Sequence, residues 1–213
     1  MKNRKFLSNC GALISGLALY LLLLTPAHSV NVADPEWPCI QAYVPEVAIA
    51  VVWPEPVDDS IAKAWRKDER LKKIVRDFGS LETISESDRD RLGEFAESIA
   101  EADRIDVLNK AASGIVEQFN RRRSDYVRGI RKFTRQQIAV AKQIEGHLNE
   151  LATLSNRTDE ESVSKRVELE ETTAWQQRIF DKRERTIGLL CDAPVEVESV
   201  MGDVLRELAQ YLP

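Results

Sequence analysis

The cysteines are the first residues of this sequence that could do chemistry. There are three, Cys10, Cys39 and Cys191, and the last two stand 152 residues apart. Reactive redox pairs usually lie close together in sequence, beside groups that stabilise a thiolate, whereas two cysteines of an exported chain most simply form a structural bridge. We therefore predict a Cys39–Cys191 disulfide, which contributes up to roughly 5 kcal/mol in the chain-entropy model. The alternatives are two separate thiols or a redox pair.

Other catalytic parts are scarce. Beyond the first 29 residues the chain has one histidine, His147, and one methionine, Met201. It has no Cys-x-x-Cys, no His-Glu-x-x-His and no glycine-rich phosphate loop. A serine triad could use only His147, which we expect at a helix surface or edge. The sequence therefore predicts no cofactor, no metal site and no enzymatic activity, and its acid pairs are too numerous to nominate a carboxylate-only hydrolase.

Acidic residues gather in two short clusters, at 159–161 and 168–171. Neither cluster has the spacing or the loop glycine of an EF-hand calcium site. We interpret both as a solvated helix start whose charges suit the helix dipole.

A basic band is the most unusual charge feature of the chain. Residues 121–135 include seven basic side chains and one acid. If a helical hairpin turns near 156–157, this segment lies opposite 178–192, which is also basic. The candidate surface for an anionic partner consists of Arg121, Arg122, Arg123, Arg128, Arg131, Lys132, Arg135, Lys182, Arg183 and Arg185.

Three interpretations of this basic band compete. One is a surface for an acidic protein, an anionic lipid or a cell-wall polymer. Another is nucleic-acid binding, which a net acidic, exported chain disfavours, so we predict no nucleic-acid partner. The third is internal pairing, with Glu94, Glu97, Glu101, Asp103, Asp181 and Glu184 as the acids.

The N-terminus has the pattern of a signal peptide, which we place at residues 1–29. Three basic residues and no acid precede an apolar run from Gly11 to Leu24, and small residues precede a cut after Ser29. The run of about 14 residues is short of the roughly 20 that a spanning helix needs. Cleavage leaves 184 residues with 27 basic and 35 acidic side chains, a net charge of −8. The alternative is an uncleaved membrane anchor.

Proline divides the rest of the chain. Five prolines crowd residues 30–57, and none occurs from Val57 to Ala193. Because proline is excluded from helix interiors, we predict an extended arm over 30–57 and a helical domain over 58–213. The apolar run from Val47 to Trp53 is expected to be a short strand or an extended piece packed on the helices, and Cys39 pins the arm to them.

Apolar spacing predicts the helices of the second part. The longest pattern, 105–154, has apolar residues three and four apart, with a kink or break near Ser113-Gly114. The helix that follows carries the apolar residues Val163, Val167, Ala174, Trp175, Ile179, Ile187 and Leu190. Short connections make neighbouring helices antiparallel. The predicted helices are Ser60–Phe78, Asp88–Asp103 capped by Ser87, 105–154, 159–190 and, starting at Pro194, 194–212.

Together these patterns predict an all-α fold. It is an elongated antiparallel helical hairpin or bundle of about five helices, with the hairpin at about 105–190 and an irregular arm rich in proline and tryptophan. A composition of 31% charged and 7% aromatic residues suits long solvated helices better than a sandwich or barrel.

The segment Asp34-Pro35-Glu36-Trp37-Pro38-Cys39-Ile40-Gln41 resembles the start of an uncharacterised group of proteobacterial exported proteins. These proteins begin with a D-P-x-W-P-C segment and continue as helices. The resemblance covers eight residues and implies export; it implies no activity.

The function expected from the sequence is that of an exported, non-enzymatic helical protein. It would be periplasmic or secreted and would act as an interaction or structural adaptor module in the cell envelope. The expected partner is an envelope protein, with anionic lipid, cell-wall polymer or a second copy of the chain as alternatives. Two other functions fit: a periplasmic holdase-type chaperone, and a membrane-anchored coiled-coil adaptor with an uncleaved N-terminus.

Overall fold

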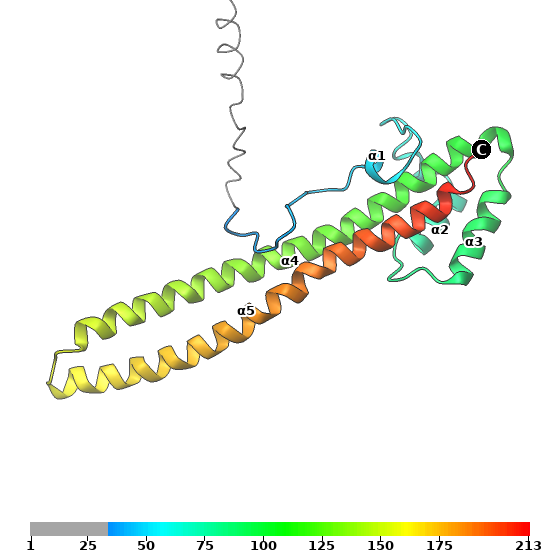
Figure 1. The fold of residues 1–213 in the computed structure, drawn as a ribbon. Coiled ribbons are helices and arrows are strands. Elements are labelled where there is room, and N and C mark those ends of the chain that lie inside the picture. Colours follow the sequence, from blue (N-terminus) through cyan, green and yellow to red (C-terminus); the bar gives the residue numbers. More distant parts are fainter. Residues whose placement is uncertain (1–33) are drawn as a thin grey trace, which may run out of the picture. The chain divides into compact units, whose positions relative to one another are not determined.

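A computed structural model describes residues 34–213, and the regular structure of this part of the chain is helical throughout (Figure 1). The predicted signal peptide and its cleavage near Ser29 lie outside the described residues. Two single-turn 3₁₀ helices, Ala64–Lys67 and Glu101–Asp103, accompany five α-helices. The α-helices are α1 (Ile49–Val52), α2 (Glu69–Phe78), α3 (Glu86–Glu97), α4 (Arg104–Leu154) and α5 (Glu160–Ala209).

Helices α4 and α5 form a long antiparallel hairpin, which confirms the predicted fold class (Figure 1). They have 51 and 50 residues, so each is about 75 Å long at 1.5 Å per residue. The reversal falls at 155–159, and Asp159 caps α5 by accepting a 2.9 Å hydrogen bond from the backbone N–H of Ser162. The bonds from Ser162 lower the pKa of Asp159, so the cap is a carboxylate.

The prediction of a separate last helix from Pro194 is wrong, because α5 continues through that residue to Ala209. An interior proline loses one backbone hydrogen bond and costs about 3 kcal/mol in a helix. Here packing on both sides outweighs that cost. Pro194 is buried, the disulfide-bonded Cys191 precedes it by one turn, and the core residues Val197 and Met201 follow it.

The shorter helices begin at other residues than predicted. The Ser60–Phe78 pattern divides into a 3₁₀ turn at Trp65 and α2, because Asp68 caps α2 by accepting from the backbone of Arg70 and Leu71 at 2.8 and 3.1 Å. Helix α3 begins after Ser85 rather than Ser87. Ser85 forms a reciprocal capping box with Asp88, an arrangement that satisfies two backbone donors at once.

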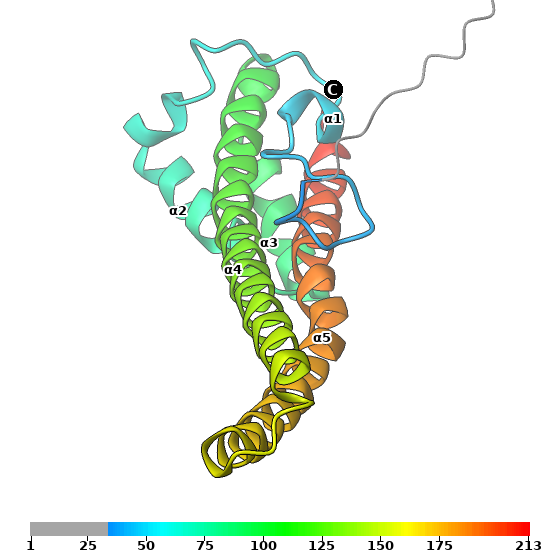
Figure 2. The same ribbon diagram turned by 90° about the vertical axis from the view of Figure 1, so that its left-hand side faces the viewer.

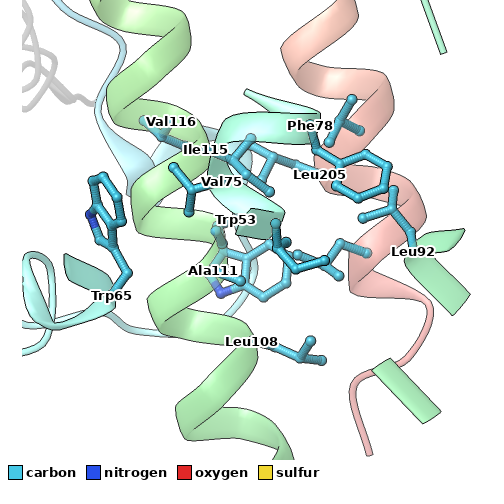
Figure 3. Packing of buried hydrophobic residues seen from close by; sticks show 14 of the residues in the cluster. Trp53, Trp65, Val75, Phe78, Leu92, Leu108, Ala111, Ile115, Val116 and Leu205 are labelled. Atoms are coloured by element: carbon cyan, nitrogen blue, oxygen red, sulfur yellow. The ribbon is translucent and has the colours of Figure 1, made fainter. Parts of the chain in front are cut away.

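The hydrophobic core lies at one end of the hairpin, which we call the base. There α2 and α3 pack against the start of α4 and the end of α5, and Trp53 from the arm enters the same cluster (Figure 3). The core residues of α4 end at Phe119 and those of α5 begin at Val197. The rest of the hairpin therefore projects beyond the core.

Gly114 permits the closest contact of the base, and α4 has no break there. A Cβ atom at residue 114 would lie 2.3 Å from Val75 Cγ2 and 3.0 Å from Trp65 Cδ2. The glycine thus lets the side chains of α2 and of the preceding 3₁₀ turn rest on the α4 backbone. A glycine inside a helix costs up to about 1 kcal/mol against alanine, so close packing is the reason for it.

We expect Gly114→Ala to lower the free energy of unfolding by about 1–3 kcal/mol, because the new methyl group overpacks the core. The matched control is Gly129→Ala in the same helix, where a Cβ would meet nothing within 4 Å. That control should gain about 0.5–1 kcal/mol from helix propensity. Urea unfolding followed by circular dichroism measures both values, and a gain in stability for both variants would contradict the packing argument.

Candidate functional site

The predicted Cys39–Cys191 disulfide is present and joins the arm to α5. The two Cα atoms lie 5.6 Å apart, and the Cys191 side chain is buried. Gln41 Nε2 donates a 2.6 Å hydrogen bond to the Cys191 carbonyl, and the indole N–H of Trp37 donates to the Gln41 carbonyl at 2.7 Å. The arm therefore closes over the bridge through hydrogen bonds of its own.

Two arginines of the basic band bind the start of the arm. Arg131 forms an ion pair with Asp34 and lies 4.5 Å from the ring centre of Tyr43. Arg135 pairs with Glu36 at 2.8 Å. The backbone N–H of Glu36 and the guanidinium of Arg131 together lower the pKa of Asp34, so this carboxyl group is an anion at neutral pH.

Arg123 is the buried centre of the arm contact. Its side chain is only 5% exposed; it forms an ion pair with Glu198 of α5 and donates to the carbonyl oxygens of Val44 and Pro45. One guanidinium thus joins α4, α5 and the arm. Arg123 is therefore not part of an exposed anion-binding surface, contrary to its place in the predicted set.

Two asparagines of α4 continue the arm contact toward the base. Asn120 exchanges two 2.9 Å hydrogen bonds with the backbone of Val47. Asn109 accepts from the indole N–H of Trp53 at 2.6 Å and donates to the Pro56 carbonyl at 3.2 Å. Residues eleven apart share a helix face, so these amides meet one continuous stretch of arm, which lies across α4 and α5 in Figure 2.

The sequence analysis did not select these asparagines. Asn109 and Asn120 are polar residues inside the apolar pattern of the 105–154 helix, three turns apart. This spacing was the signal that could have selected them. The run Val47–Trp53 packs on the helices as expected, since Trp53 is buried, but four of its residues form α1 instead of an extended segment. A strand would need a partner edge, whereas the Asn120 amide supplies the backbone pairing here.

The remaining basic residues divide into paired and solvent-facing groups. Arg121 pairs with Glu117 within α4, Arg122 donates to the Leu81 carbonyl at 2.7 Å, and Arg128 pairs with Asp125. The acids that the band contacts are therefore in the arm, in α4 itself and at Glu198, rather than the acids predicted for internal pairing. In the described part of the chain, the exposed basic residues without an ion pair within 4 Å include Lys132, Lys182, Arg183 and Arg185.

The distal hairpin, residues 124–190, has a seam of mixed character. Its buried residues are apolar at four positions and polar at four: Val127, Ile130, Ile144, Leu154, Thr134, Gln137, Ser162 and Thr173. Gln137 Nε2 donates to the Phe180 carbonyl at 3.3 Å. Burying a polar side chain contributes less to stability than burying an apolar one, so this seam stabilises the hairpin less than an apolar seam would.

Several of the apolar residues predicted for this hairpin lie outside its seam, whereas the predicted Ile130 and Ile144 are buried in it. Val163, Val167 and Trp175 are exposed, and Trp175 is 58% exposed. On α4, Leu148 is exposed while the neighbouring His147 is half-buried, with its Nδ1 atom unpartnered in the described chain. A two-helix seam accepts about two of every seven residues, and polar residues take several of these places here.

Two hollows border the arm. One, of about 570 Å³, is lined mainly by apolar side chains, among them Trp37, Val51 and Val195. Arg123 and Glu198 also line it. The other, of about 520 Å³, lies between the arm and α4 near Asn120. At the first hollow Arg123 pairs with Glu198 and also binds the arm, so these contacts close the arm onto the helices.

Two further surveys apply to residues 34–213. No three His, Cys, Asp or Glu side chains in this range come together as a metal-binding group. Over the same residues, no helix combines the length and the apolar character needed to cross a bilayer.

Comparison with known proteins gives no relative for this chain. No protein-family model matches it, and neither a curated protein nor a solved structure does.

We expect Arg123→Met to lower the free energy of unfolding by about 2–4 kcal/mol. The change leaves Glu198 and the carbonyl oxygens of Val44 and Pro45 without their donor. Arg121→Met is the matched control on the same helix, since its ion pair is exposed and worth less than about 1 kcal/mol. Chemical denaturation checks both values, and equal effects at the two positions would contradict the central role of Arg123.

Removing the disulfide should loosen the arm and leave the helices formed. For Cys39→Ala/Cys191→Ala we expect a loss of about 2–5 kcal/mol in unfolding free energy and an unchanged helical circular dichroism spectrum. Limited proteolysis should then cut within 34–48 first. Wild-type protein treated with a thiol reductant is the control and should behave like the variant. An arm as resistant as in the oxidised protein would show that its noncovalent contacts are sufficient.

Proposed function

We propose that this chain is an exported, non-enzymatic helical protein that acts as an interaction or structural module in the cell envelope. One observation carries the proposal: the core occupies the base, while residues 120–196 project beyond it. Apolar burial is the main stabilising contribution to a fold. A hairpin with a half-polar seam and exposed apolar residues adds less of it than the base does. We interpret the distal hairpin as a surface for a partner.

Export is the compartment that best suits the disulfide. Structural disulfides form and persist in oxidising compartments outside the cytoplasm, and the Cys39–Cys191 bridge fixes the arm. The basic and apolar pattern of residues 1–29 supports the same assignment. We propose that cleavage after Ser29 releases the protein to the periplasm or the medium.

We further propose that the distal hairpin is an antiparallel two-stranded coiled coil. From 127 to 144 its buried positions on α4, at residues 127, 130, 134, 137 and 144, follow steps of three, four, three and seven, while the buried Leu154 at the end of α4 falls outside this spacing. Such heptad spacing is typical of left-handed supercoiled helices. A coiled coil gives a projecting element that is stiff enough to hold a partner away from the base.

A holdase-type chaperone is the second candidate function. The observation that favours it is the exposed apolar side chains of the distal hairpin, among them Val167, Trp175 and Leu189, which could bind unfolded clients. An anionic lipid or polymer partner would instead use the exposed basic residues Lys132, Lys182, Arg183 and Arg185. A membrane-anchored adaptor differs from all of these by an uncleaved leader.

Export is tested by expressing the full chain with a C-terminal tag in a proteobacterial host. We expect the tagged protein in the periplasmic or secreted fraction, oxidised, with Val30 as its first residue. A cytoplasmic, reduced protein would contradict the proposal, and an intact N-terminus in the membrane fraction would favour the anchored adaptor.

The interaction role is tested by photo-crosslinking in the same cells. A crosslinking amino acid at Lys182 on the distal hairpin should give discrete adducts, because that surface is proposed to hold the partner. The same probe at Glu82, exposed at the base, is the matched control and should give none. Suppression of client aggregation by the purified protein at equimolar ratio would favour the holdase, and a reproducible catalytic turnover would overturn the proposal.

A further inference from the structure

Helix α5 carries a second heptad-like stripe on its outer side. Its members follow one another at steps of three or four residues, and every one of them is exposed. Most stripe members lie two residues before or after a position that faces α4, such as 162, 173 or 187. At 100° per residue they are about 200° around the helix from the seam, on the opposite side of α5. We call this set the outer stripe; it consists of Glu160, Ser164, Val167, Glu171, Trp175, Arg178, Lys182, Arg185 and Leu189.

The outer stripe has apolar contacts to offer. Val167 is 57%, Trp175 58% and Leu189 73% exposed. Single exposed apolar residues are common on protein surfaces, but here three share one face of one helix at heptad-like spacing. Tryptophan and arginine are also the residues that most often dominate binding energy at interfaces. Trp175 stands near the middle of the stripe, with Arg178 one turn away.

The charge of the outer stripe changes sign at Trp175. Glu160 and Glu171 precede it, while Arg178, Lys182 and Arg185 follow it. In the described part of the chain, none of these five side chains lies within 4 Å of an opposite charge; nearby pairs such as Lys165–Glu150 and Arg128–Asp125 use other residues. The two halves of the stripe therefore carry opposite charges, and these charges are not neutralised by ion pairs in the described part of the chain.

We propose that a second copy of this chain docks on the outer stripe, with the two α5 helices antiparallel. This inference rests on the proposed function, since it names the partner of the distal hairpin. A two-fold axis between residues 174 and 175 brings Glu171 of each copy opposite Arg178 of the other. It also places Glu160 within one turn of the partner's Arg185, and the two Trp175 rings meet at the axis.

Symmetry selects this arrangement. A closed two-fold contact uses the same patch on both copies, so that patch must be complementary to itself. An antiparallel pairing meets this condition because of the sign change, whereas a parallel pairing would set acid against acid and base against base. An anionic polymer would use only the basic half. The stripe spans about 45 Å at 1.5 Å per residue, a long contact with an aromatic centre and charged ends.

The test is the oligomeric state of the oxidised mature protein, measured by sedimentation equilibrium over a range of concentrations. We expect a monomer–dimer equilibrium that weakens with added salt. Trp175→Ala should raise the dissociation constant by about tenfold or more. Glu171→Arg and Arg178→Glu should each do the same, because each sets like charges opposite one another. Circular dichroism checks that every variant keeps its helices.

Charge exchange makes the test specific. Each of the Glu171→Arg and Arg178→Glu proteins should be mainly monomeric alone, but a mixture of the two should form heterodimers. The double variant carries both exchanged charges and should form a homodimer again. Glu97→Arg, at an exposed position of α3, changes the net charge equally and should leave the dimer intact. Ala174→Cys, near the axis, should form a disulfide-linked dimer under oxidising conditions.

A wild-type protein that stays monomeric at all concentrations would overturn the inference, as would a dimer that is indifferent to the three stripe substitutions. The proposed function fails differently. If the protein is monomeric but Lys182 crosslinks to another envelope protein, the interaction role stands and only the second copy is excluded. If Lys182 crosslinks only to a second copy of the chain and the purified protein dimerises through the stripe, the dimer stands without an envelope partner.

Discussion

The close packing of α2 on α4 at the base is the constraint on which the rest of the structure depends. Gly114 lets Val75 and Trp65 rest directly on the α4 backbone, and around this contact the core gathers α3, the end of α5 and Trp53 of the arm. This cluster holds the two ends of the hairpin together. The distal hairpin is the continuation of α4 and α5 beyond this cluster, so the cluster fixes how the two helices start out side by side.

The irregular arm is attached to the helices both by the disulfide and by hydrogen bonds and ion pairs. Proline keeps this segment from forming a long helix, so its backbone needs partners from elsewhere. Helix α4 provides them on one face through Asn109, Asn120 and Arg123. The basic band is thus partly an internal device, and the arm's own acids neutralise some of it at Arg131 and Arg135.

The sequence predicts features that depend on neighbouring residues better than features that depend on contacts between distant ones. The bounds of α4 were predicted to within a residue because three-and-four apolar spacing is a local signal. The disulfide was predicted because only one pairing remained once Cys10 was assigned to the predicted signal peptide. The exposure of Trp175 could not be predicted, since both sides of α5 carry three-and-four spacing and only the facing helix decides which is buried. The Arg131–Asp34 pair joins residues far apart in sequence, which composition and periodicity do not connect. The continuity of α5 at Pro194 likewise depends on tertiary packing that outweighs a local rule.

The position of the disulfide also sets an order of events in the life of the chain. Cys39 lies near the start of the described residues and Cys191 in the second half of α5, and the covalent loop between them encloses the whole hairpin turn. Chains are made from the N-terminus, so Cys39 is synthesised well before Cys191 and the bridge can close only after the hairpin turn has been made. The arm is therefore without its covalent attachment until most of the chain has been synthesised.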